Sequence, residues 1–201
     1  MSGKRNKSTK CTNSFNWLVP GFLAIGDWHA GADLKKLKEM GIRGVVAATR
    51  KLPRKIENYE KNDIAIFHIP IRDAPDADIT QWFGPVHDFI DYFMTKNKKN
   101  GKGYGVLVHC AAGRSRSVTI LTSFVMKRLN LPPTQALNMV RAVRPCEWVN
   151  DGFIRQLKDY RTFLLAEQKR NEAKVRKVRK SRGKSRTKIR RTKKRSRQRR
   201  T

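Results

Sequence analysis

Short apolar runs alternate along this chain with stretches in which apolar residues recur at helical spacing. Runs rich in small and β-branched residues predict buried strands, and they occupy residues 22–25, 44–48, 64–69 and 105–108. Apolar residues three or four positions apart predict helices over residues 33–40, 79–96, 118–129, 133–143 and from 153 onward. This alternation predicts an α/β domain with a mostly parallel central sheet flanked by helices, and a ligand at the carboxyl ends of its strands.

The most informative stretch follows the last predicted strand and reads HCAAGRSRS over residues 109–117, here called the signature loop. It leads into a predicted helix, where unpartnered N–H groups and the helix dipole stabilise a phosphate or a thiolate. Helix N-termini and nearby cations favour the reactive thiolate of a cysteine, here Cys110. The planar guanidinium of Arg116 can bind two oxygens of one phosphate. The loop therefore predicts nucleophilic chemistry on a phosphate ester.

The signature loop resembles that of the cysteine-dependent protein phosphatases, in which His-Cys, five residues, Arg and then Ser or Thr follow one another around a central glycine, here Gly113. Residues 111–117 most closely resemble the same positions of the small atypical or viral dual-specificity phosphatases. The resemblance to this family runs from about residue 17 to about residue 165. It implies a protein tyrosine phosphatase-like fold. A structural cysteine that happens to lie near an arginine is the plainer alternative, since cysteine is often a small core residue.

The resemblance also implies roles for individual residues. Cys110 is the expected nucleophile, Ser117 the expected hydrogen-bond donor to its sulfur, and His109 the residue that orients the loop and tunes the thiolate. The residues expected to bind the substrate phosphate are Ala111, Ala112, Gly113, Arg114, Ser115 and Arg116. Arg116 would also stabilise the transition state. Arg114 is expected to face solvent, where it could touch a second phosphate or an acidic flank of the substrate.

An aspartate is expected to protonate the leaving oxygen. Asp73 is our choice, because it follows a predicted strand within residues 70–78, here called the aspartate loop, and resembles the general acid of the family. Asp76 and Asp78 are the alternatives, and Asp78 is expected to cap the following helix through its carboxylate.

The net charge of +30 is concentrated at the carboxyl end. Residues 169–201, the basic tail, hold 19 of the 46 Lys and Arg but only one of the 16 acidic residues. Such a segment cannot bury enough apolar surface to fold alone, so it is expected to be disordered or to prolong the last helix. The predicted organisation is a flexible basic segment over 1–16, a catalytic domain over 17–168 and the tail over 169–201.

Three cysteines do not make a disulfide framework or a metal cluster, which favours a reducing compartment. A reversible disulfide between Cys110 and Cys146 is an alternative to a purely structural Cys146. Neither a metal nor another cofactor is expected, because His29, His68 and His87 lack metal-ligand spacing. Without an apolar signal sequence or a membrane-length run, the chain is expected to be soluble and intracellular, without membrane insertion.

The expected function is hydrolysis of phosphotyrosine, phosphoserine and phosphothreonine in proteins through a cysteinyl-phosphate intermediate. An RNA 5′-triphosphatase or another phosphoester phosphatase of the same superfamily is the alternative, and a binding module with a dead site is a third class. The basic tail is expected to bind nucleic acid or another polyanion nonspecifically. It would favour a nucleus or a nucleic-acid-rich compartment if the host is eukaryotic, including the host of a virus.

Overall fold

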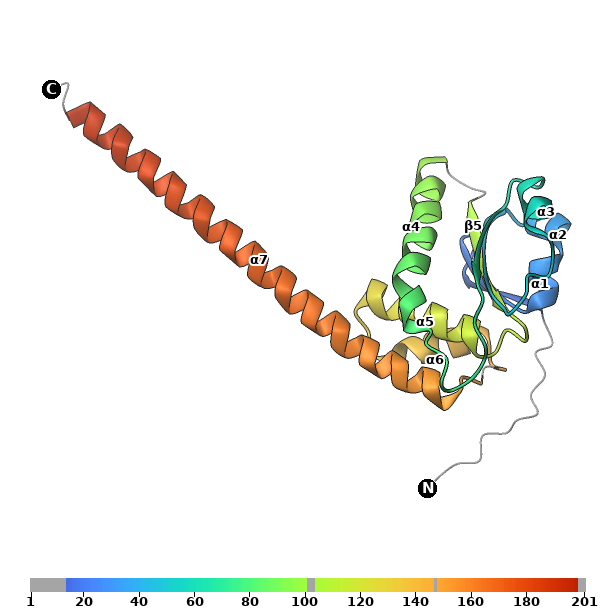
Figure 1. Cartoon of the computed structure of the whole chain (residues 1–201). Coiled ribbons are helices and arrows are strands. Elements are labelled where there is room, and N and C mark those ends of the chain that lie inside the picture. The colour runs from blue at the N-terminus through green and yellow to red at the C-terminus, as the bar shows by residue number, and fades with distance from the viewer. Residues whose placement is uncertain (1–13, 101–103, 147, 199–201) are drawn as a thin grey trace. The chain divides into compact units, whose positions relative to one another are not determined.

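The computed structural model describes residues 14–100, 104–146 and 148–198 (Figure 1). It divides into a unit that ends at Arg161 and a second unit that begins at Thr162. The first unit contains the sheet and helices that the sequence predicted.

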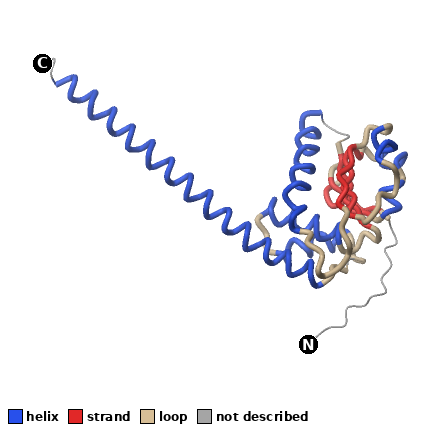
Figure 2. Tube along the Cα trace, viewed as in Figure 1, coloured by secondary structure: helices blue, strands red, loops and turns tan. Residues whose placement is uncertain are grey.

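A five-stranded sheet lies at the centre of the first unit (Figure 2). Its strands are β1 (Phe15–Val19), β2 (Leu23–Gly26), β3 (Ile42–Ala48), β4 (Ala65–Ile69) and β5 (Gly105–Cys110). They lie in the order β1-β2-β5-β3-β4, and only β1 pairs antiparallel to its neighbour. The expected mostly parallel sheet is confirmed. Because β5 is the central strand, its carboxyl end lies between the carboxyl ends of β2 and β3.

Helices cover both faces of this sheet (Figures 1 and 2). One face carries three short helices, α1 (Trp28–Ala32), α2 (Leu34–Glu39) and α3 (Ile56–Glu60), whereas α4 (Phe83–Asn100) and α5 (Arg116–Leu129) cover the other, and α6 (Pro133–Val143) packs against α5. All six residues of β5 are buried, as expected for a parallel strand that is covered on both sides.

The two faces have different cores. Leu107 and Val45 belong to a buried cluster with Leu37 of α2 and Tyr59 of α3. On the opposite face, Gly44 of β3 leaves room for α4, because a Cβ at that position would lie 2.8 Å from the Phe93 ring. The close approach of α4 therefore requires glycine at this point of the strand.

Several elements differ from the sequence expectation. Strand β1 and the helices α1 and α3 were not predicted; each of the three is only five residues long. Helix α4 was expected to end at Lys96, yet it continues to Asn100. It is preceded by a 3-10 turn over Thr80–Trp82, which was expected to be part of the same helix.

The second unit continues α7 (Asp151–Gln198), whose first turns belong to the first unit. Most of its residues, such as Lys and Arg, are good helix formers, and no proline interrupts it. Of the two states expected for the basic tail, the structure has the helical one as far as Gln198. Within the described residues, no helix combines the length and the apolar character needed to cross a membrane.

Candidate active site

The signature loop joins the end of β5 to the start of α5, which is the strand-to-helix connection that the sequence predicted. Gly113 adopts a left-handed backbone with φ of 63°, and a Cβ there would lie 2.7 Å from the carbonyl oxygen of Gly26. Any other residue at position 113 would be strained and would collide with the end of β2. The loop therefore curls tightly over the N-terminus of a 14-residue helix.

Cys110 lies at the base of this loop with 1% of its surface exposed. The Ser117 hydroxyl donates a hydrogen bond to its sulfur over 3.3 Å, as the sequence predicted. This bond links the first turn of α5 to the base of the signature loop. Cys110 is a free thiol, whereas Cys146 is disulfide-bonded, so the alternative of a Cys110–Cys146 disulfide is absent from this structure.

His109 supports the loop from inside the sheet. Its Nδ1 lies 3.4 Å from the carbonyl oxygen of Cys110, where it can only donate a hydrogen bond. The ring packs against Gly31 of α1, where an added Cβ would lie 2.4 Å from Nε2. Burial lowers the pKa of His109 to about 4, which makes the ring neutral near pH 7. A neutral, tightly packed imidazole suits the orienting role that the sequence suggested.

Arg116 is the first residue of α5 and has only 8% of its surface exposed. One guanidinium nitrogen donates to the Ile71 carbonyl oxygen over 3.1 Å, and Nε lies 3.7 Å from the Asp73 carboxylate. The side chain thereby links the signature loop to the aspartate loop.

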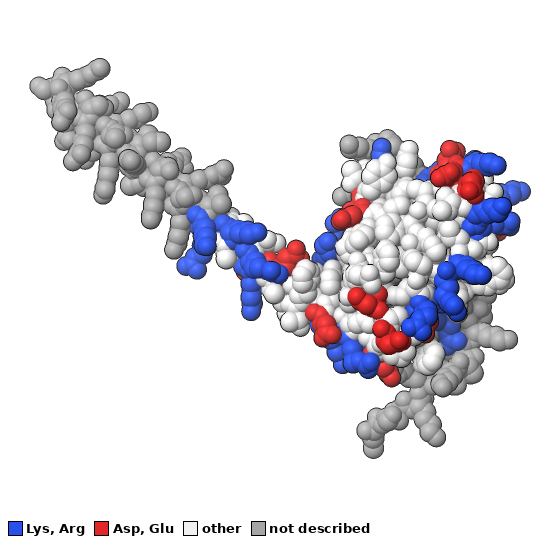
Figure 3. All heavy atoms as spheres, in the orientation of Figure 1, with Lys and Arg blue, Asp and Glu red and all other residues white. Residues whose placement is uncertain are grey.

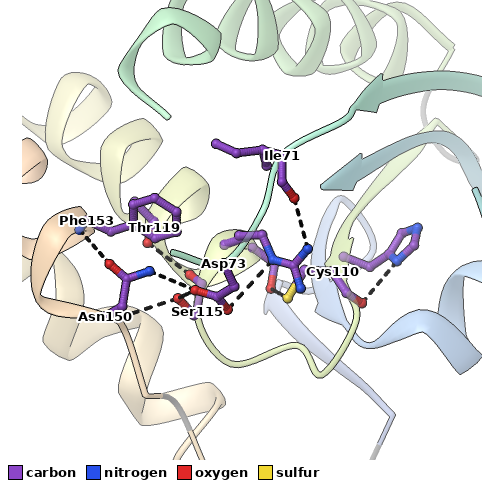
Figure 4. A network of polar contacts seen from close by, with 10 residues as sticks. Ile71, Asp73, Cys110, Ser115, Thr119, Asn150 and Phe153 are labelled. Carbon is purple, nitrogen blue, oxygen red and sulfur yellow. Dashed lines mark hydrogen bonds and ion pairs between the residues drawn. The ribbon is translucent and has the colours of Figure 1, made fainter. Parts of the chain in front are cut away.

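Asp73 is the member of the three candidate aspartates that reaches the signature loop (Figure 4). Its Oδ1 accepts hydrogen bonds from the Ser115 hydroxyl and from the Asn150 amide, both over 2.7 Å. Asp76 instead pairs with Arg72, and the Asp78 carboxylate accepts the N–H of Thr80 at the start of the 3-10 turn. The structure thus brings together Asp73, Cys110 and Arg116 and leaves Asp76 and Asp78 in local contacts.

The first turns of α7 hold the aspartate loop in place. The Gln156 side chain accepts the N–H of Ile79 and donates to the carbonyl oxygen of Ala77, both over 2.9 Å. Gly152 lies so close that a Cβ there would be 2.0 Å from the Pro75 carbonyl oxygen. These contacts and that of Asn150 were not predicted, because a helix start and a family-like turn at residues 150–153 do not show which loop they contact.

A second set of contacts fixes the outer side of the signature loop. Arg144 has 1% of its surface exposed, and it donates to the Gly113 carbonyl oxygen over 3.0 Å and to the Asn16 amide oxygen over 2.6 Å. Burial lowers the pKa of Arg144. Residues 144–145 and 150–153 resemble the family's turn before its last helix, but this resemblance did not predict the contacts of Arg144 with the signature loop.

Arg114 requires a correction. The expectation that it faces solvent is wrong, because it is half-buried and its Nε donates to the Cys146 carbonyl oxygen over 2.8 Å. Its own carbonyl oxygen accepts the N–H of Trp148. Arg114 thus ties the signature loop to the segment before α7. Within the described ranges, no group of three or more His, Cys, Asp or Glu side chains could hold a metal ion.

Residues 23–163 match a protein-family model described as dual specificity phosphatase, catalytic domain. The match covers the sheet from β2 onward, the signature loop and the aspartate loop.

Individual relatives agree with this match. The chain is 37% identical over 147 residues to mouse dual specificity protein phosphatase 14, a match that covers 73% of this chain and 69% of that protein. It is 34% identical over 151 residues to human dual specificity protein phosphatase 6, where the match covers 75% of this chain but only 38% of the relative.

Solved structures give the same fold. The crystal structure of DUSP15 superposes with a TM-score of 0.63 at 28% identity, covering 76% of this chain and 95% of that one. The crystal structure of human DUSP28 superposes with a TM-score of 0.64 at 24% identity, covering 79% and 99%; this likeness bears on the fold alone.

The contacts of Asn150 predict how the aspartate loop is held. Its amide donates to Asp73, while its side-chain oxygen accepts the N–H of Phe153 in the first turn of α7. Asn150→Asp keeps a capping oxygen but replaces the donor with a carboxylate that repels Asp73, so amide hydrogen exchange in residues 72–77 should accelerate while stability stays near that of the wild type. Asn150→Ala should accelerate the same exchange and also cost about 1 kcal/mol of unfolding free energy.

Hydrogen exchange followed by mass spectrometry and urea unfolding measure the two effects separately. Unchanged exchange in both variants would show that Asn150 caps the helix without holding the loop.

Proposed function

The chain belongs to the dual-specificity phosphatase family, and from this membership we propose that it hydrolyses phosphotyrosine, phosphoserine and phosphothreonine in proteins through a cysteinyl-phosphate intermediate. The observation that carries the proposal is the convergence of Cys110, Arg116 and Asp73 around one loop at a helix N-terminus. Those three groups supply a nucleophile, a phosphate ligand and an acid.

In the proposed first step, the Cys110 thiolate attacks phosphorus while the bond to the leaving oxygen breaks. The Arg116 guanidinium and the backbone N–H groups of residues 111–116 bind the phosphoryl oxygens, whose charge the dipole of α5 also stabilises. Asp73 donates its proton to the leaving oxygen, so that a neutral alcohol or phenol departs. The hydrogen bonds from Ser115 and Asn150 fix the direction of this carboxyl group.

In the second step, water attacks the phosphocysteine and the Asp73 carboxylate accepts its proton. The bond between sulfur and phosphorus breaks, and inorganic phosphate leaves. The Ser117 hydroxyl stabilises the sulfur anion that is regenerated, because it donates to Cys110 over 3.3 Å. His109 is neutral at this pH and acts by orienting the loop rather than by carrying a proton.

Protein substrates are favoured over RNA 5′-triphosphate by the sequence AAGRSRS after Cys110, which resembles dual-specificity phosphatases rather than capping-type enzymes. The catalytic body of this chain is also small, and in this respect it resembles enzymes of the family that have a shallow pocket. Such a pocket would admit phosphoserine and phosphothreonine as well as phosphotyrosine. The chain spans 38% of the length of the human phosphatase that it matches.

The basic tail supports a separate role in binding polyanions. Its 19 cations would neutralise phosphates of RNA or DNA and release their counterions, a mode of binding that does not depend on base sequence. Such a tail would retain the enzyme in a nucleic-acid-rich compartment, including the nucleus of a eukaryotic host.

The substrate class is tested by comparing kcat/KM on a phosphotyrosine peptide, a phosphothreonine peptide and 5′-triphosphate RNA. Turnover of both peptides well above that of the RNA is expected. Preferential release of the terminal phosphate from RNA, with little peptide turnover, would assign the chain to the alternative chemistry.

Cys110→Ser should abolish turnover while phosphopeptide binding persists, because a hydroxyl at neutral pH is protonated and a poor nucleophile. Arg116→Lys should also lose most activity, since an ammonium group cannot form the two parallel hydrogen bonds of a guanidinium. Steady-state rates and titration with a phosphopeptide measure both effects. Substantial turnover by purified Cys110→Ser protein would rule out the covalent route.

Asp73→Asn should slow turnover by a factor of about 100 to 1,000 for esters with poor leaving groups. Aryl phosphates whose leaving groups are strong acids need no proton, so their rates should change much less. Asp76→Asn, which alters an exposed aspartate in the same loop, is the matched control. An equal loss across the leaving-group series, or a larger loss in the control, would move the acid role away from Asp73.

Truncation before Lys169 removes a net charge of +18 and none of the residues of the proposed site. Turnover of a small aryl phosphate should stay near that of the full chain, whereas retention on RNA or DNA should fall steeply. Retention of the full chain should also weaken strongly with added salt. If the truncated protein binds nucleic acid unchanged, the polyanion surface lies on the body instead.

A further inference from the structure

A hollow of about 670 Å³ lies between α1, α2 and α3, on the face of the sheet opposite α4. Three cations line it from different segments, namely Lys35 of α2, Arg54 before α3 and Lys61 after α3. Asn58 and Asn62 add amide groups. The hollow is distinct from the signature loop, and no step of the proposed reaction uses it.

The cations of this hollow are available to an anion. Within the part of the chain that the structure describes, no ion pair joins Lys35, Arg54 or Lys61 to a carboxylate. Asp33 also lines the hollow and offsets one of these three positive charges, while its Oδ1 accepts the N–H of Lys36 at the start of α2. Figure 3 shows Lys and Arg side chains along the side of the body where α1–α3 lie in Figure 1.

An aromatic pair connects the hollow to the signature loop. The backbone N–H of Trp28 donates to the carbonyl oxygen of Ala111, directly after Cys110, and the Trp28 side chain is 48% exposed. Its ring lies 3.8 Å from the ring of His29, centre to centre, and His29 lines the hollow. A chain that leaves the signature loop across α1 would therefore pass over Trp28 and His29 before it meets the three cations.

We propose that this hollow is a substrate subsite, which binds an acidic or phosphorylated side chain of the peptide near the phosphoresidue that is cleaved. The proposal rests on the proposed function. Helix α1 rises about 6 Å from Trp28 to Ala32, and an extended peptide advances about 3.3 to 3.6 Å per residue. The length of α1 alone corresponds to about two residues of extended peptide, so the recognised side chain should lie at least about two residues from the phosphoresidue.

The shape of the charge distribution favours a peptide over a nucleic acid. The hollow gathers three cations around one concave site, with Asp33 on its wall and the aliphatic side chain of Leu34 beside it. That arrangement suits one carboxylate or phosphate on a flexible side chain, whereas a polynucleotide favours a groove of positive charge that follows its backbone. The long run of cations in this chain is the basic tail.

The test uses the full chain and compares kcat/KM on phosphotyrosine peptides that differ at one position. Each peptide carries glutamate, phosphoserine or alanine at two, three or four residues on either side of the phosphotyrosine. Lys35→Glu combined with Lys61→Glu reverses the charge of the hollow and leaves Arg54, whose Nε donates to the Ala32 carbonyl oxygen, in place. Lys96→Glu combined with Lys127→Glu makes the same charge change on α4 and α5, the other face of the sheet.

An acidic residue at the favoured position should raise kcat/KM of the wild type by about three- to tenfold, mainly through KM, as expected for one or two exposed ion pairs. Added salt should weaken this preference. It should disappear or reverse in the hollow variant and persist in the control variant. All variants should hydrolyse a small aryl phosphate at the wild-type rate, and the tail contributes equally to all of them.

If the alanine peptide is hydrolysed but acidic positions give no preference, or the same preference in all variants, the subsite is disproved while the proposed function stands. If no phosphopeptide is hydrolysed although the aryl phosphate is, the proposed function fails and the subsite fails with it. If the hollow variant loses RNA binding or RNA 5′-triphosphate turnover and keeps its peptide preference, the surface serves nucleic acid instead.

Discussion

The site depends on one constraint, which is that a buried central strand must turn directly into the N-terminus of a helix. Strand β5 brings Cys110 to the point where α5 begins, and only five residues separate it from Arg116. The turn is possible because Gly113 takes a left-handed backbone against Gly26, and because the buried Arg144 donates to the Gly113 carbonyl oxygen. The backbone of Gly113 and the hydrogen bond from Arg144 therefore fix the conformation of the loop before any phosphate binds.

The second requirement is to bring an acid to this loop from a distant part of the chain. The aspartate loop follows β4, which is separated from β5 by β3 in the sheet, and it is held by the first turns of α7. Asn150 makes two contacts at this point. Its side-chain oxygen caps α7 by accepting the N–H of Phe153, and its side-chain NH2 donates to Asp73. A helix terminus and the proposed acid are thereby stabilised by the same side chain.

Sequence reasoning reached the parts whose signals are local. The strand, loop and helix around Cys110 follow from an apolar run, a glycine and an apolar helix. The choice of Asp73 over Asp76 and Asp78 comes from the resemblance to the family, and its role as the acid stays a prediction. Helices α1 and α3 are too short for a helical period to register. Asn150 contacts a residue 77 positions earlier, and the burial of Arg144 departs from the usual exposure of arginine, so the contacts of these two residues could not be found without the tertiary structure.

The central claim is that Cys110 forms a covalent bond to the phosphoryl group. The most direct measurement is rapid acid quenching during turnover of an aryl phosphate, followed by mass spectrometry of the peptide that contains residues 109–117. The account predicts one phosphoryl group on the Cys110 sulfur, which accumulates early and disappears when substrate is exhausted. Turnover at the full rate with no phosphoryl group on this peptide, or with the group on another side chain, would contradict it.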